Sequence, residues 1–110
     1  MQYIYRGDIW WCDLPAPFGD RPVLVLQSDR LNKSAIETTI VAVISSDLKL
    51  LNSPDNVLIK SKNFLLEKDS VVKVSQILTV DKDTLYNKRG KLTHSLLQSV
   101  ERGVARTLLL

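Results

Sequence analysis

Short apolar segments recur along this chain, and the segment 22–27 constrains the fold most. Its core, Val23-Leu24-Val25-Leu26, is continuously apolar, which is typical of a β-strand buried on both faces. Further segments share apolar or β-branched residues between turn formers and predict more strands: 8–14, 38–44, 56–59 and 70–80, the last with a bend. The polar stretches 29–34 and 63–66 each predict one helical turn.

The end of the chain has a different periodicity. Apolar residues recur there at intervals of three and four, as on one face of a helix: Leu97, Val100, Val104 and Leu108. Thr93 is a suitable N-cap for a helix over 93–109. Gly103 costs that helix about 1 kcal/mol relative to alanine, so we expect close packing against the sheet. The sequence predicts a mainly β fold with short helices, a strongly bent sheet or barrel against which a C-terminal α-helix packs.

Length and composition narrow the class of protein. We expect a single domain over residues 1–110, because this length suits one hydrophobic core. The formal net charge of +3 allows a polyanionic partner but is weak evidence for one. No apolar run is long enough to span a membrane, and a lone cysteine, Cys12, fits a reducing cytoplasm. One histidine and one cysteine make a metal site improbable, so we expect neither a metal nor another cofactor.

Arg21 stands at the start of the central apolar strand, directly before Pro22. Proline and a buried strand restrict the backbone there, which suits a cation that must meet a phosphate in one geometry. The same residue could simply face water at the strand edge, as most surface arginines do. The segment 15–20 before it contains two prolines and a glycine and is expected to form a movable loop.

The order of these segments resembles the MazF/PemK family of toxin endoribonucleases. The resemblance starts with Arg6-Gly7-Asp8-Ile9-Trp10, a loop and Arg21-Pro22-Val23-Leu24-Val25. It continues over nearly the whole chain through these segments: Leu31–Lys33, Val41–Ser46, Glu67–Val72 and Ser75–Lys82. The resemblance implies a small SH3-like or CcdB-like barrel. It also implies the toxin of a type II toxin–antitoxin system, which cleaves single-stranded RNA at selected sequences by attack of a 2′-hydroxyl, without a metal.

The resemblance also implies a set of site residues. Arg21 corresponds to the catalytic arginine of the family, and Ser45 to its catalytic threonine or serine. A guanidinium offers paired donors to phosphoryl oxygens, and a hydroxyl adds another donor. Further residues in the matched segments are expected to contact RNA: Asp20, Asn32, Ser46, Lys73, Ser75 and Gln76.

Two departures from the family concern the site. The loop before Arg21 lacks the Ser-Glu-Gln stretch found in many members, and Ser75 stands where some members have an aspartate that acts as general base. The proton acceptor is therefore open. Asp20 is the nearest carboxylate in sequence, and a turn aspartate capping its own backbone is its alternative role.

Several alternatives stay open at this stage. A CcdB-like gyrase inhibitor shares the fold without cutting RNA, and a plain RNA-binding barrel would bind without cleavage. The family resemblance implies a homodimer, a cognate antitoxin and, with that antitoxin, operator DNA. His94 is expected at a helix end, outside the site. Trp10 and Trp11 are adjacent on a strand, so one faces the core and the other a surface, in an order that the sequence leaves undecided.

Overall fold

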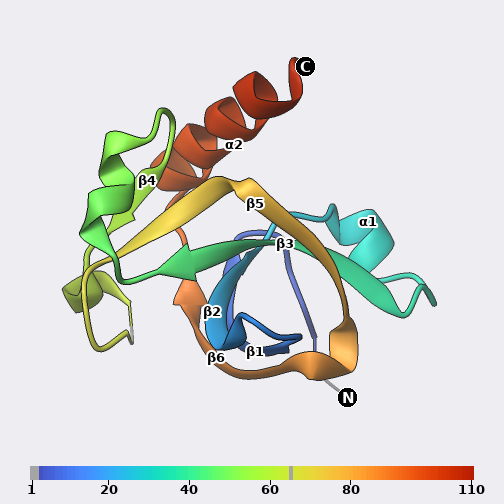
Figure 1. Cartoon of the computed structure of the whole chain (residues 1–110). Coiled ribbons are helices and arrows are strands. Elements are labelled where there is room, and N and C mark those ends of the chain that lie inside the picture. Colours follow the sequence, from blue (N-terminus) through green and yellow to red (C-terminus); the bar gives the residue numbers. More distant parts are fainter. Residues whose placement is uncertain (1–2, 65) are drawn as a thin grey trace.

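Six antiparallel strands form one curled sheet in the part of the chain that the computed structural model describes, residues 3–64 and 66–110 (Figure 1). The strands are β1 (Asp8–Leu14), β2 (Gly19–Val25), β3 (Thr38–Ser45), β4 (Val57–Ile59), β5 (Ser70–Asp81) and β6 (Leu85–Lys91). Their order across the sheet is β4-β5-β3-β2-β1-β6. The helices are α1 (Asp29–Asn32) and α2 (His94–Leu108), and 3₁₀ turns lie at η1 (Leu48–Asn52), η2 (Ser61–Asn63) and η3 (Lys82–Thr84).

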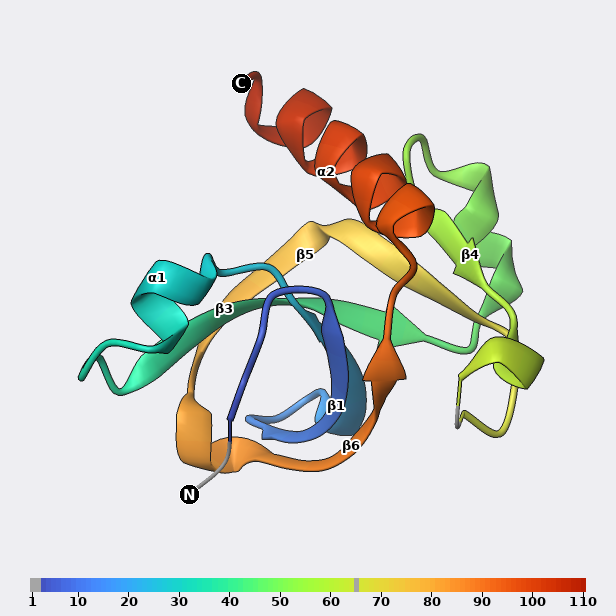
Figure 2. The ribbon, with the colours of Figure 1, turned by 180° about the vertical axis from the view of Figure 1, so that it is seen from behind.

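Both faces of the central strands are covered. Inside the curl, one core cluster gathers inward-facing residues of β1, β2 and β3 with Val80 and Leu85. On the outer face, a second cluster joins Leu24, Ala42 and Ile44 to Val100 of α2. Figure 2 shows α2 lying across this outer side of the sheet. The apolar run in 22–27 is thus buried on both faces, as predicted, because successive side chains of β2 enter different cores.

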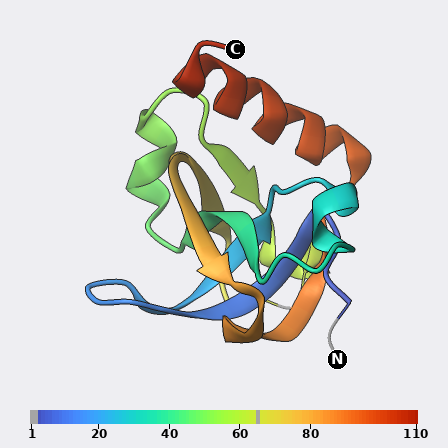
Figure 3. The ribbon, with the colours of Figure 1, turned by 90° about the vertical axis from the view of Figure 1, so that its right-hand side faces the viewer.

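The predicted strands match the observed ones with shifted ends. β2 spans 19–25 instead of 22–27, because Gly19 and Asp20 pair with Leu14 and Asp13 of β1. The predicted loop 15–20 is therefore too long, and only 15–18 forms the turn, which projects from the body in Figure 3. The fourth strand covers 57–59, and β5 is continuous but irregular opposite Ala42–Ile44. The 63–66 turn lies at 61–63 instead, and residue 65 of that prediction lies outside the described residues.

Strand β6 has no counterpart in the sequence analysis. Most of its residues are polar and only Leu85 is buried, so the segment lacks an apolar pattern. A buried carboxylate on β1 helps to hold β6 against β1. Asp8 is fully buried, and its Oδ1 lies 3.2 Å from Nζ of Lys88 and 3.5 Å from Nζ of Lys91. Its Oδ2 accepts hydrogen bonds from the Tyr5 amide and from the indole of Trp10.

Helix α2 begins where predicted. The hydroxyl of Thr93 accepts a hydrogen bond from the Leu96 amide, which caps the first turn. Val100 and Gly103 are buried, and a Cβ placed on Gly103 would lie 2.7 Å from the Asp55 carbonyl oxygen and 2.9 Å from Val74 Cγ1. The expected close packing at this glycine is confirmed. Among the described residues, no helix has the length and apolar character needed to cross a membrane.

Replacing Gly103 by alanine should lower the free energy of unfolding by about 1–3 kcal/mol, the usual cost of overpacking. Alanine is the better helix former by about 1 kcal/mol, so a gain would be expected if packing did not matter. Denaturant unfolding measures the change, with Gln98→Ala on the exposed side of α2 as the control. Stability equal to or above wild type for Gly103→Ala would contradict the tight contact.

Candidate active site

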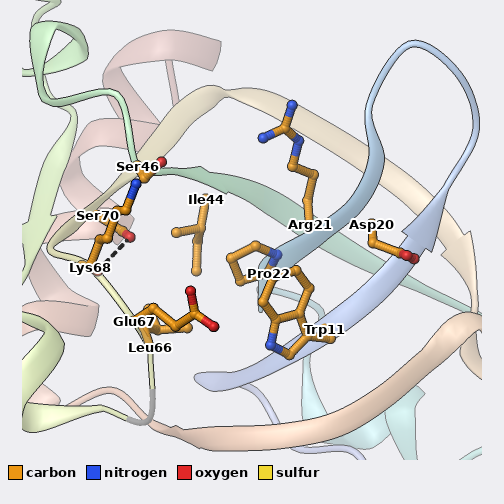
Figure 4. A pocket seen from close by; sticks show the side chains of 10 residues that line it. All are labelled: Trp11, Asp20, Arg21, Pro22, Ile44, Ser46, Leu66, Glu67, Lys68 and Ser70. Atoms are coloured by element: carbon orange, nitrogen blue, oxygen red, sulfur yellow. Dashed lines mark hydrogen bonds between the residues drawn. The ribbon is translucent and has the colours of Figure 1, made fainter.

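A cavity of about 220 Å³ lies where β2 begins and β3 ends, beside the segment that leads into β5 (Figure 4). We call it the Arg21 pocket. It is lined by residues of four separate segments: Trp11, Asp20, Arg21, Pro22, Ile44, Ser46, Leu66, Glu67, Lys68 and Ser70. Three of the predicted site residues, Asp20, Arg21 and Ser46, therefore line one cavity.

Arg21 is exposed and lies on β2 opposite Cys12 of β1. Its Nε donates a hydrogen bond of 2.9 Å to the carbonyl oxygen of Phe18 in the preceding turn. This contact orients the guanidinium and uses only one of its donors. Within the described part of the chain, the two terminal nitrogens have no protein partner, so a paired donor set is left for an anion.

Ser45 is the last residue of β3 and is half-buried. Its Oγ accepts a hydrogen bond of 3.2 Å from the Asp47 amide, so the hydroxyl proton is left to donate elsewhere. The β2–β3 ladder ends at the pair Val23–Val43, and Arg21 and Ser45 lie two residues beyond it, so alternation sets both side chains on the face of Val23 and Val43. Ser45 is not among the lining residues of the pocket, whereas its neighbour Ser46 is.

Asp20 is a strand residue and not a turn residue. It pairs with Asp13 across β1 and β2, so the role of a turn aspartate capping its own backbone is wrong. Its carboxylate accepts a hydrogen bond from the phenol of Tyr86 on β6. Loss of solvent around the phenol raises the pKa of Tyr86, and the hydrogen bond to Asp20 and its negative charge raise it further.

Lys73, Ser75 and Gln76 lie in the irregular middle of β5 and do not line the Arg21 pocket. Nζ of Lys73 donates a hydrogen bond of 3.3 Å to Oε1 of Gln76, and Ser75 is exposed. Val71 is the partner of Ser45, and Lys73 follows it by two residues. Alternation along the strand therefore sets Lys73 on the same face as Ser45.

Asn32 is not brought to this pocket. Its side chain is buried in a hydrogen-bond network at the end of α1. Oδ1 accepts from Gln27 Nε2 at 3.0 Å and from Thr39 Oγ1 at 2.8 Å, and Nδ2 donates to the Gln27 carbonyl oxygen at 2.9 Å. These bonds satisfy the amide internally, so Asn32 holds α1 against β3. Its contact with RNA stays a prediction that this geometry does not favour.

Most of the residues that line the pocket are not among the site residues predicted from the sequence. Glu67 and Lys68 come from a polar run that was matched to the family only as a strand start, and Leu66 precedes them. The structure also shows which of the two adjacent tryptophans faces the core. Trp10 is 7% exposed and donates to Asp8, whereas Trp11 lines the pocket beside Pro22 (Figure 4). Adjacent aromatic residues were the available signal, since one of them had to face outward.

Two reactive residue types lie outside the pocket. His94 is exposed at the first residue of α2, as expected. Cys12 is buried, and burial raises the pKa of its thiol, so its role is that of a small core residue. In residues 3–64 and 66–110, no three side chains of the His, Cys, Asp and Glu types gather in a way that could hold a metal ion.

Comparison with known proteins assigns a family to this arrangement. Residues 5–108 match the family described as PemK-like, MazF-like toxin of type II toxin–antitoxin systems. Endoribonuclease MazF6 of Mycobacterium tuberculosis (strain ATCC 25618 / H37Rv) is 42% identical over 110 residues, which cover 96% of each chain. Endoribonuclease EndoA of Bacillus subtilis (strain 168) is 34% identical over 112 residues, covering 97% of this chain and 96% of EndoA.

Solved structures share the fold at lower sequence identity. The Mycobacterium tuberculosis toxin MazF-mt6 superimposes with a TM-score of 0.81 at 21% identity, covering 94% of this chain and 97% of that one. A mycobacterial endoribonuclease in complex with its cognate antitoxin gives a TM-score of 0.79 at 21% identity, covering 100% and 97%. The predicted curled β fold with a C-terminal helix is confirmed.

These matches do not favour a CcdB-like gyrase inhibitor or a plain RNA-binding barrel, because the relatives that cover nearly the whole chain are named endoribonucleases. The family match extends across every strand that contributes to the Arg21 pocket. The chain belongs to the PemK-like, MazF-like toxins of type II toxin–antitoxin systems.

Proposed function

We propose that this chain is the toxin of a type II toxin–antitoxin pair and cleaves single-stranded RNA at selected sequences without a metal ion. The observation that carries the proposal is the guanidinium of Arg21, which is oriented by the Phe18 carbonyl and has two unpaired nitrogens at the pocket. The family match supports RNA cleavage as the activity. The single cysteine, Cys12, is buried and free, which is compatible with a cytoplasmic location of the protein.

The chemistry follows from the RNA itself. The ribose 2′-hydroxyl attacks the adjacent phosphorus and displaces the 5′-oxygen of the next nucleotide, which leaves a cyclic phosphate and a 5′-hydroxyl. Negative charge grows on the phosphoryl oxygens during this step. Arg21 would stabilise that charge with two parallel hydrogen bonds, and Ser45 would add a third through its unused proton. Single strands suit this reaction because in-line attack needs a flexible backbone.

The proposed partners are an antitoxin and a second copy of the chain. A homologous mycobacterial fold has been solved with its cognate antitoxin, which supports an antitoxin here. The homodimer follows from the family resemblance, and exposed apolar side chains available to its interface include Ile36, Ile40, Leu48 and Leu51. Binding of operator DNA by the complex with the antitoxin stays a prediction of the family resemblance.

Cleavage of a long RNA of mixed sequence should persist in EDTA, because the proposed step uses only Arg21 and Ser45 as donors. Mapping of the product ends should find a cyclic phosphate or phosphate on one fragment and a free 5′-hydroxyl on the other. Complete loss of cleavage on chelation, with recovery when magnesium is added, would overturn the mechanism.

Arg21→Ala should reduce the cleavage rate about 10²–10³-fold, the usual loss for one preorganised donor group, while the fold stays intact. Arg21→Lys should recover little, because an ammonium lacks the planar fork. Arg102→Ala, an exposed arginine of α2, and His94→Ala should cleave as wild type does. Rates from single-turnover assays measure the effect. A folded His94→Ala without activity beside an active Arg21→Ala would refute the site.

Ser45→Ala should lower the rate by a smaller factor than Arg21→Ala, because a neutral donor is weaker than a charged one. Ser45→Thr keeps the hydroxyl and should cleave RNA at close to the wild-type rate. Ser46→Ala is the matched comparison, since Ser46 lines the pocket while Ser45 shares a face of the sheet with Arg21. A larger loss for Ser46→Ala than for Ser45→Ala would transfer the donor role to Ser46.

The antitoxin should cover Arg21 and displace the turn 15–18, which projects from the sheet (Figure 3). Hydrogen exchange of the complex should then show protection around Arg21, and binding should weaken as salt rises if acidic side chains reach the pocket. Protection confined to the face away from Arg21, with cleavage still blocked, would mean that inhibition does not work by covering the site.

A further inference from the structure

The Arg21 pocket contains a carboxylate that the proposed cleavage step does not use. Glu67 lies on the segment before β5, and Figure 4 shows its carboxylate directed into the pocket between Ile44 and Trp11. Within the described part of the chain, this carboxylate has neither a hydrogen-bond donor nor a cation as partner. Glu67 is exposed, so water solvates its carboxylate in the free chain. Because a carboxylate repels phosphate, in a pocket filled by RNA it would either accept the 2′-hydroxyl proton or contact another part of the nucleotide.

The floor of the same pocket suits a flat ring. It is formed by the indole of Trp11, the ring of Pro22 and the side chain of Ile44. Nucleobases stack on aromatic side chains of this kind, and Trp11 is held in place as a strand residue between Pro22 and Tyr86. The volume of about 220 Å³ is below the roughly 300–1,000 Å³ of sites for drug-sized ligands. One base is therefore a suitable occupant.

We propose that this pocket binds a single guanine base next to the scissile phosphate, with Trp11 as the stacking surface and Glu67 as the residue that selects the base. The inference rests on the proposed function, since it assumes that RNA occupies the pocket. Arg21 on the rim would hold the phosphate while the adjoining base enters the cavity. Single-stranded RNA offers its Watson–Crick edge to such contacts, because the bases are unpaired.

The preference for guanine follows from hydrogen-bond chemistry. A carboxylate is an acceptor only, and its two oxygens can accept two parallel hydrogen bonds. Among the four bases, guanine alone presents two adjacent donors, N1–H and the N2 amino group. Adenine and cytosine each present one amino donor beside a ring nitrogen that repels a carboxylate, and the single N–H of uracil lies between two carbonyl oxygens.

The opposite end of a bound guanine would also find partners. Its O6 is an acceptor, and the donors that line the pocket besides Arg21 include the ammonium of Lys68 and the hydroxyl of Ser46. Figure 4 shows the end of the Lys68 side chain beside Ser46. The Lys68 ammonium has no partner among residues 3–64 and 66–110, so it is available to a base. The donors and the acceptor thus match guanine at both ends of its edge.

Binding of oligonucleotides that cannot be cleaved tests this selection without requiring activity. The probes are labelled uridine pentamers with guanosine, adenosine, cytidine or uridine at the centre and 2′-deoxyribose throughout, which removes the attacking hydroxyl. Anisotropy measures their affinities. We expect the guanine probe to bind about five- to 150-fold more tightly than the other three, the usual range for one good bidentate base contact. The fluorescence of Trp11 should change with this probe, and Trp11→Phe should lose that change.

Glu67→Gln should abolish the preference for guanine, because the amide replaces one acceptor by a donor. Glu37→Gln, an exposed carboxylate outside the pocket, should retain the preference. Trp11→Ala should weaken all four probes by about five- to 150-fold, the loss typical of one stacked base. If Trp11→Ala does not fold, Trp11→Phe and its loss of the fluorescence change test the stacking role.

Equal affinities for the four probes, or a guanine preference that survives Glu67→Gln, would overturn the inference. A Glu67→Gln variant that cleaves every sequence more slowly, with unchanged base preference, would also overturn it and would point to proton transfer instead. The proposed function fails separately. RNA that wild type cuts without guanine beside the cut contradicts only the base assignment, whereas guanine-selective binding without any cleavage contradicts only the nuclease.

Discussion

The burial of β2 and β3 on both faces is the constraint on which the rest of this structure depends. Val23, Val25, Val41 and Val43 fill the inside of the curl, while Leu24 and Ala42 need cover outside it. The sheet must therefore curl on one side and receive α2 on the other. The same burial fixes the register of β2 against β3, since a slip of one residue would exchange the two cores. Arg21 and Ser45 lie two residues beyond the last pair of this ladder, so their side chains share the face of Val23 and Val43.

Several lysines of this chain stabilise the fold. Lys88 and Lys91 lie within ion-pair distance of Asp8, and Lys82 donates to the carbonyl oxygens of Asn32 and Ser34. These lysines pair with a buried carboxylate or donate to backbone carbonyl oxygens, so several of the positive side chains serve the fold instead of meeting a phosphate. Arg21 and Lys68 are different, because their charged ends have unused donors at the pocket.

Sequence patterns predicted the elements whose apolar residues repeat periodically. They missed the segments whose positions depend on contacts with residues far away in the sequence. The buried strands and α2 were readable because apolar residues repeat at intervals of two, or of three and four. β6 was not, because it is held by Asp8 and by strand pairing instead of an apolar stripe. Among the pocket residues, Arg21 was predicted from its place before a buried strand and from the family resemblance. Glu67 and Lys68 were not assigned to the site, because nothing local in a polar loop reveals which cavity it will border.

The residues that line the pocket come from two kinds of backbone, paired strands and a connecting segment. Arg21, Pro22 and Trp11 belong to strands whose neighbours are fixed by backbone pairing, so their positions follow from the sheet. Leu66, Glu67 and Lys68 belong to the connection between η2 and β5 and border the same cavity from outside the sheet. Groups that stabilise a transition state must be held rigidly, whereas residues on a connection can change without disturbing the core. Substitutions on this connection alone would thus change the lining of the pocket, while the pairing of β1 with β2 leaves Arg21 in place.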